Sequence, residues 1–129
     1  MITIQILHRS LLGYGIRAYI DYYFKRHPIK AAKIVSSKHI NYKYKSNIYF
    51  IIKSFFMTSN QMYKYLDDIR LTHFHASIII IGSHIDYEEI FKNHYRVFGV
   101  IDTTTNKSFT FIRDQISFYL DSLYNSKKL

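Results

Sequence analysis

The chain has 129 residues, 48% of them hydrophobic, and no cysteine. This length suits one domain with its own core, and the lack of cysteine excludes disulfides and thiolate metal sites. No apolar run is long enough for a membrane helix, and residues 1–4 do not begin a signal peptide, so we expect a cytoplasmic protein. The 13 Tyr and 10 Phe exceed the needs of such a core, which predicts exposed aromatic rings.

The net charge of +9 is concentrated in the first half of the chain. Residues 1–64 hold 11 Lys and Arg against one acid, Asp21, whereas residues 65–129 hold 7 basic residues against 8 acids. A one-sided field favours an acidic partner, such as nucleic acid, an acidic protein or an anionic membrane. A solvated basic face that only aids solubility explains the pattern equally well.

Alternation of apolar and polar residues over 2–7 predicts a first strand. Ser10 is expected to cap a helix to about Lys25, and His27-Pro28 ends that helix because the residue before proline disfavours the α conformation. A short second strand follows at 31–36, and the polar, basic segment 39–46 is a loop or one turn of helix. The apolar stripe of the helix consists of Leu12, Ile16, Ile20 and Tyr23.

The apolar run 48–56 predicts a buried central strand. Thr58 or Ser59 caps the next helix, and 76–81 is the clearest strand of the chain. A short helix over 86–95 carries acids in its first turn, where they complement the helix dipole. A strand at 97–101 precedes a last helix from Ser108 to about Leu123. Its predicted core stripe is Phe109, Ile112, Ile116, Leu120 and Leu123.

This alternation of strands and helices predicts right-handed crossovers and a parallel sheet covered on both faces. Five strands in this length favour an α/β, flavodoxin-like sheet of order 2-1-3-4-5. We expect one domain over 1–129, which is either a complete protein or the N-terminal half of a longer one.

Three segments carry a resemblance to a known family. Residues 4–16 (IQILHRSLLGYGI), 78–84 (IIIIGSH) and 97–101 (VFGVI) resemble strands one, four and five of the receiver domain of bacterial response regulators, with the turns that follow. The resemblance is greatest to the branch that precedes LuxR-type helix-turn-helix domains, and it spans nearly the whole chain. It implies a receiver fold and a role in transcription regulation.

The phosphorylation site of that family is missing from this sequence. Phosphorylatable receivers use two acids after the first strand for Mg²⁺, an Asp at the end of the third, a Thr or Ser after the fourth and a Lys after the fifth. The corresponding positions here are His8 and Arg9, Lys53, Gly82 or Ser83, and Thr103 or Asp102. No acid lies between Asp21 and Asp67, so a shift of one residue does not restore the site.

The resemblance therefore implies a degenerate pocket of His8, Arg9, Lys53, Ser83 and Thr103 that cannot hold Mg²⁺ or form an aspartyl phosphate. Three of these, His8, Arg9 and Lys53, are expected to converge at the carboxyl ends of the strands, where such folds bind ligands. The pocket then holds phosphate or another small anion, or it drifted after phosphorylation was lost. We favour the second interpretation.

Other groups of residues give weaker evidence for a metal, catalytic or nucleic-acid site. His73 and His75 resemble half a metal site, with His84 or His94 to complete it, but two histidines in a loop before a strand usually bind nothing. No nucleophile elbow, glycine-rich nucleotide loop or P-loop is present, so we expect no enzyme, no cofactor and no metal. A basic and aromatic stretch could contact an anion or single-stranded nucleic acid, although a solvated loop is the preferred interpretation: Lys38, Lys43, Tyr44 and Lys45.

The last helix carries a second apolar stripe, in which Phe111 and Phe118 lie off the core face with Asp114 and Gln115 between them. Exposed rings on one helix indicate a partner. The resemblance implies dimerisation through the first and fifth helices, or through the fourth helix, fifth strand and fifth helix. We therefore expect these four residues in a symmetric protein interface.

The preferred hypothesis is a phosphorylation-independent pseudo-receiver domain of a bacterial transcriptional regulator. It would form a homodimer or pair with a related regulator, and DNA would be contacted by a domain not present in this chain. The alternative is a module that binds nucleic acid or an acidic protein directly through its basic half. We expect no association with a membrane.

Overall fold

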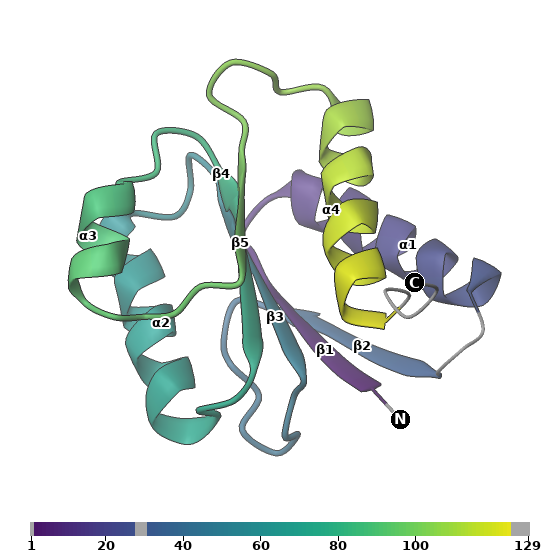
Figure 1. Cartoon of the computed structure of the whole chain (residues 1–129), viewed down its shortest axis with the longest axis horizontal. Helices are drawn as coiled ribbons and strands as arrows, with labels where there is room; N and C mark the ends of the chain where they lie inside the picture. Colours follow the sequence, from purple (N-terminus) through teal and green to yellow (C-terminus); the bar gives the residue numbers. More distant parts are fainter. Residues whose placement is uncertain (1, 28–30, 125–129) are drawn as a thin grey trace.

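The computed structural model describes residues 2–27 and 31–124. Figure 1 shows a twisted sheet between two layers of helices. In chain order the elements are β1 (Ile2–Leu7), α1 (Leu11–Arg26), β2 (Ala32–Ser37), β3 (Ile48–Lys53), α2 (Ser59–Thr72), β4 (Ser77–Gly82), α3 (Tyr87–Lys92), β5 (Gly99–Asp102) and α4 (Phe109–Tyr124).

The five strands are all parallel and lie in the order β2-β1-β3-β4-β5, which confirms the predicted fold class. The first strand pairs on both sides: Ile6 lies beside Ser36 of β2 and beside Phe50 of β3. Because every strand runs the same way, all five carboxyl ends meet at one edge of the sheet. The short strand β5 forms the outer edge next to β4.

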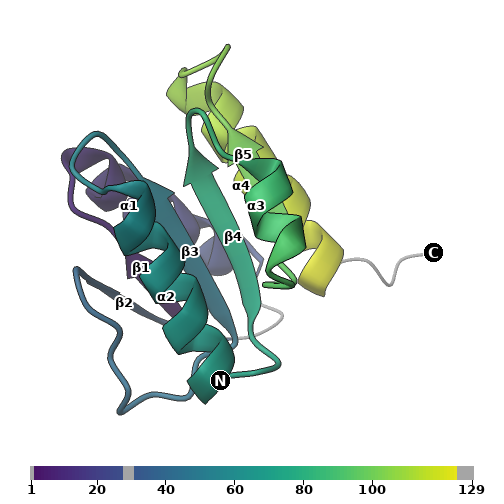
Figure 2. The same ribbon diagram turned by 90° about the vertical axis from the view of Figure 1, so that its left-hand side faces the viewer.

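Both faces of the sheet are buried. Helices α1 and α4 cover one face, and α2 and α3 cover the other, as the side view in Figure 2 shows. The apolar strand β4 serves both layers: Ile79 and Ile81 pack towards α1 and α4, whereas Ile78 and Ile80 pack towards α2 and α3. Burial on two sides explains why this strand has no polar alternation.

Several predicted boundaries differ in the structure: α3 ends at Lys92 rather than 95, and β5 begins at Gly99 rather than 97. The third strand ends at Lys53 rather than 56, because Ser54 begins a turn in which its carbonyl accepts from the Met57 N–H. Phe55 is consequently 95% exposed. In α4, the prediction for Phe109 and Phe111 was wrong in both positions: Phe111 packs against the core, and the partly exposed ring of Phe109 lies over Gly15 of α1.

No helix connects β2 to β3, and the chain between them forms a loop at 38–47. A buried glutamine of β1 holds this loop. Gln5 Nε2 donates to the Asn41 carbonyl (2.8 Å) and to Ser46 Oγ (2.9 Å), and Gln5 Oε1 accepts from the Asn41 N–H (2.9 Å). A polar side chain at position 5 bonds the backbone of this loop because a loop, unlike a helix, leaves N–H and C=O groups without hydrogen-bond partners of their own.

One arginine of α2 holds the loops that precede β4 and β5. Arg70 Nε donates to the Tyr95 carbonyl (2.6 Å), Nη1 donates to the carbonyls of Phe74 and Ala76 (2.9 Å each), and Nη2 donates to that of Arg96 (2.8 Å). These bonds join the loop before β4 to the loop before β5. Within the described part of the chain, no helix is long and apolar enough to cross a membrane.

Two glycines of α1 provide a matched test of this packing. A Cβ at Gly13 would lie 2.1 Å from the ring of the buried His8, whereas one at Gly15 would lie 3.4 Å from the nearest atom of the Phe109 ring. We expect Gly13→Ala to destabilise the protein by roughly 1–3 kcal/mol through overpacking. Gly15→Ala should be neutral or stabilising by up to about 1 kcal/mol, because alanine favours the helix.

Urea denaturation of the two variants and the wild type measures both effects. A Gly13→Ala variant as stable as Gly15→Ala would contradict the close contact between α1 and His8.

Candidate functional site

Two hollows lie at the carboxyl edge of the sheet, and they divide the five residues of the predicted degenerate pocket. We call the first the β3–β5 pocket. It has a volume of about 180 Å³ and is lined by Leu12, Lys53, Ser54, Ile81, Gly82, Ser83, Thr103, Lys107 and Ile112. The structure therefore brings Lys53, Ser83 and Thr103 together, as expected.

A chain of hydrogen bonds runs through this pocket. Lys107 Nζ donates to Ser83 Oγ (2.9 Å), and Ser83 Oγ lies 3.0 Å from Oγ1 of the buried Thr103. The Thr103 N–H donates to the Gly82 carbonyl (2.9 Å). Together these bonds join the turn after β4 to the loop after β5. The sequence analysis missed Lys107, which enters the pocket from that loop.

The β3–β5 pocket is cationic. Lys53 and Lys107 line it, and none of its lining residues carries a carboxylate. Asp102, the nearest acid in sequence, faces elsewhere: its carboxylate accepts from the Thr104 N–H (2.9 Å) and the Tyr87 hydroxyl (2.9 Å). Its bonds to Thr104 lower the pKa of Asp102 below its ordinary value. Ammonium and hydroxyl groups are suited to an anion, not to Mg²⁺.

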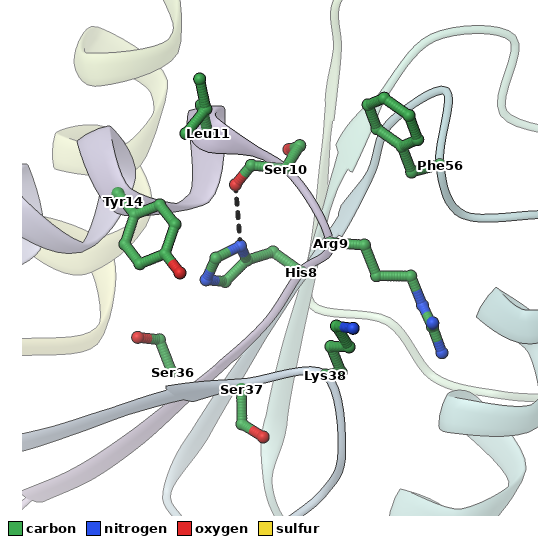
Figure 3. Close-up of a pocket in the computed structure, with 9 residues that line it drawn as sticks. All are labelled: His8, Arg9, Ser10, Leu11, Tyr14, Ser36, Ser37, Lys38 and Phe56. Carbon is green, nitrogen blue, oxygen red and sulfur yellow. Dashed lines mark hydrogen bonds between the residues drawn. The ribbon is translucent and has the colours of Figure 1, made fainter.

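The second hollow, the β1–β2 pocket, contains the other two predicted residues (Figure 3). It has a volume of about 450 Å³ and is lined by His8, Arg9, Ser10, Leu11, Tyr14, Ser36, Ser37, Lys38 and Phe56. The expected convergence of His8, Arg9 and Lys53 is therefore not seen. Although β1 and β3 are paired neighbours, the side chain of Lys53 lines the β3–β5 pocket, whereas His8 and Arg9 line the β1–β2 pocket.

The buried imidazole of His8 is fixed in place. His8 Nδ1 lies 3.0 Å from the Ser10 carbonyl, and the ring packs edge-to-face against Tyr14 with centroids 5.0 Å apart. Because a carbonyl oxygen only accepts, Nδ1 carries the hydrogen. Arg9 extends the other way, towards α2, where Nη2 donates to the Tyr65 hydroxyl (3.4 Å).

The two histidines considered for a metal are occupied or exposed. The Tyr49 hydroxyl lies 2.7 Å from His73 Nδ1, and His75 is exposed beside the ring of Phe74. Burial, and then the charge of Lys45, lower the pKa of His73. Across residues 2–27 and 31–124, no three His, Asp or Glu side chains gather as metal ligands would.

The basic loop 38–47 presents its lysines to solvent but not its central ring. Lys38, Lys43 and Lys45 are exposed, whereas Tyr44 is half-buried. Lys33 Nζ lies 4.0 Å from the centre of the Tyr44 ring, and hydrogen bonding to Lys33, together with its charge, lowers the pKa of the Tyr44 hydroxyl. One face of that ring is consequently covered, and it is not available for stacking on a base.

The predicted interface residues on α4 separate in the structure. Phe118 is 60% exposed and Asp114 is exposed, whereas Gln115 is half-buried and Phe111 packs against the core. Phe118 instead contacts Tyr119 (ring centroids 5.4 Å apart), which contacts Phe98 beside β5 (5.8 Å). With the partly exposed Tyr87 of α3, these rings form what we call the β5-edge surface: Tyr87, Phe98, Phe118 and Tyr119.

Comparison with known proteins was informative only at the level of structure. No family model matches the sequence, and no curated protein matches it. Among solved structures, it is similar to a CheY-like protein (tadZ) from Pseudomonas aeruginosa PAO1, with a TM-score of 0.60 and 8% identity over 95% of this chain and 99% of that one. A response regulator receiver domain protein from Clostridium thermocellum gives a TM-score of 0.58 and 12% identity over 99% and 98% of the two chains.

A third similar structure is an adenylate cyclase from Rhodopirellula baltica, with a TM-score of 0.58 and 9% identity over 98% of this chain and 94% of that one. The chain has a receiver-like fold. At identities this low the similarity establishes the architecture, and the function has to be argued from the residues of this chain.

The first prediction from this site concerns phosphorylation. Because the β3–β5 pocket contains two lysines and no carboxylate, we expect no acyl phosphate to form when the chain is incubated with acetyl phosphate and Mg²⁺. Intact-mass spectrometry checks this, with a phosphorylatable receiver as the positive control for the reagents. A stable gain of one phosphoryl group would show that an acid outside this pocket accepts phosphate.

The second prediction concerns pH. Because His73 has a pKa below its ordinary 6.5, the folded protein favours neutral imidazole, and the unfolded chain takes up the proton at higher pH. This contribution to stability is complete above about pH 6.5 and is lost as the pH falls through the lower folded-state value. His73→Gln should therefore make the free energy of unfolding depend less on pH between about 5 and 7.

Urea denaturation across that pH range measures the slopes, and the exposed His75 provides the control as His75→Gln. If the His73→Gln and wild-type slopes were equal, another group would have to account for the acid sensitivity.

Proposed function

We propose that this chain is a phosphorylation-independent receiver domain of a bacterial transcriptional regulator, and that it acts by dimerising. The observation that carries the proposal is the exposed β5-edge surface on a receiver-like fold whose phosphorylation pocket contains no acid. The partner is a second copy of this chain or a related regulator. Contact with DNA would belong to a separate domain.

The bonds in the β3–β5 pocket support independence from phosphate. In the family that the chain resembles, a hydroxyl after the fourth strand and a lysine after the fifth respond to the phosphoryl group. Here Lys107 and Ser83 bond to each other, and Ser83 bonds to Thr103. The two segments are therefore already joined, and they need no phosphate between them to hold their positions.

Exposed rings and an open strand edge support an interface. Phe118 and Phe98 are 60% and 41% exposed on either side of Tyr119. They flank β5, which among the described residues pairs only with β4. Its outer edge therefore has no strand partner there, although the Tyr119 hydroxyl donates to the Val100 carbonyl (3.4 Å). Rings and an unpaired edge together are what a protein partner covers.

Charge favours a second copy as that partner. The β5-edge surface belongs to residues 65–129, which hold 7 basic residues and 8 acids, whereas the excess positive charge lies in residues 1–64. Two copies that meet through this surface therefore keep their strongly basic halves apart. Direct binding of nucleic acid has less support, because Lys33 covers one face of the Tyr44 ring.

Replacing the two most exposed rings of the surface tests this proposal. We expect the wild type to form a dimer that persists at high salt, because apolar contacts are not screened, and Phe98→Ser with Phe118→Ser to shift it to monomer. Sedimentation across a concentration series at two salt levels measures the mass. The control is Leu71→Ser, which removes an 84% exposed side chain from α2 on the other face of the sheet and should leave the dimer intact.

Two results would overturn the proposal. One is a wild type that stays monomeric at every concentration. The other is a double variant that is folded, as judged by its thermal unfolding, and still dimerises like the wild type.

A further inference from the structure

The β1–β2 pocket lies at the carboxyl ends of β1 and β2, next to the point between β1 and β3 where the direction of the chain connections reverses. The strand β1 lies between β2 and β3, and α1 leaves it towards one face of the sheet while α2 follows β3 towards the other (Figure 1). Open α/β sheets bind ligands in the crevice that this reversal leaves at the carboxyl ends of the strands. Its volume of about 450 Å³ falls within the usual size of small-molecule sites, roughly 300–1,000 Å³.

The lining combines cations and hydroxyls with aromatic rings. Figure 3 shows Lys38 between the hydroxyl side chains of β2 on one side and Arg9 on the other. The rings of Tyr14 and Phe56, which are 63% and 66% exposed, come from α1 and from the segment after β3. Cations and hydroxyls suit a phosphate, and exposed rings suit a flat heterocycle.

Arg9 is held in position but incompletely bonded. Its Nη2 donates to the Tyr65 hydroxyl, which itself donates to the Lys38 carbonyl. Its Nε is buried and has no hydrogen-bond partner among the described residues. Buried donors are almost always paired, so this Nε lacks an acceptor, which the described residues do not supply.

Ser10 adds a second unpartnered group beside it. This residue precedes α1, yet its hydroxyl makes no capping bond, and Ser10 Oγ is buried without a partner in the part of the chain that the structure describes. Ser10 lines the β1–β2 pocket at the first turn of α1, whereas the guanidinium of Arg9 extends towards α2. An anion in the pocket would lie near that first turn, where the helix dipole favours negative charge.

We propose that the β1–β2 pocket binds a mononucleotide. Lys38 and Arg9 receive the phosphate, and the base lies against the exposed ring of Tyr14 or Phe56. A lone phosphate would leave most of the pocket and both rings unused. This site uses none of the residues of the β5-edge surface, so nucleotide binding and dimerisation are tested independently of each other.

Titration of the ¹⁵N-labelled chain with AMP, GMP, CMP and UMP, followed by NMR, tests the proposal. We expect saturable shifts confined to residues 8–14, 36–38 and 56, and tighter binding than with inorganic phosphate or adenosine alone. Arg9→Gln should weaken binding roughly ten- to hundredfold, since it removes a charge-assisted contact. Tyr14→Ser, at an exposed ring, should weaken it severalfold without affecting the fold.

The matched control is Lys92→Gln, which removes an exposed positive charge from α3 on the other face and should leave binding unchanged. Absence of saturable shifts, equal affinity for phosphate and nucleotide, or equal weakening by Arg9→Gln and Lys92→Gln would each overturn the proposal. So would shifts centred on the basic loop at 43–45, which would indicate binding of a strand of nucleic acid there.

Discussion

The parallel pairing of β1 with β2 on one side and β3 on the other determines where everything else lies. It places β1 between β2 and β3, so that β1 is paired along both edges. The helices that follow β1 and β3, α1 and α2, then pack on opposite faces of the sheet. His8, Arg9 and Ser10 follow this strand directly, so they lie where the helical layers diverge. The later strands add their carboxyl ends to the same edge, which brings Ser83 and Thr103 to a neighbouring hollow.

The architecture was predictable because it depends on patterns that are local in the chain. The apolar run at Ile78–Ile81 and the capping residues Thr58 and Ser108 marked their elements correctly. The errors arose where an element meets its end. The end of β3 depends on a turn made by the polar side chain and backbone of Ser54. The partly exposed ring of Phe109 lies against Gly15 of α1, a contact between two helices that no periodicity within α4 reports.

The site was predictable only in its residue types. The absence of acids could be read directly, and it correctly indicated a cationic pocket. Which side chains meet in that pocket depends on the reach of loops, so Lys107 was missed, and His8 and Arg9 were assigned to the wrong hollow. The four carbonyls that Arg70 binds come from two loops separated in sequence from each other, and no local signal identifies an arginine with that role.

The glutamine of β1 that holds the 38–47 loop has a consequence for how this protein opens. Gln5 bonds the loop at Asn41 and Ser46 from a strand that is itself paired on both sides. Releasing these bonds would leave the buried side-chain amide of Gln5 without partners. Separation of the loop from β1 therefore costs free energy as long as the strand stays in place. Loop and sheet should therefore belong to one cooperative unfolding unit, and slow amide exchange at Asn41 would follow that of the central strands.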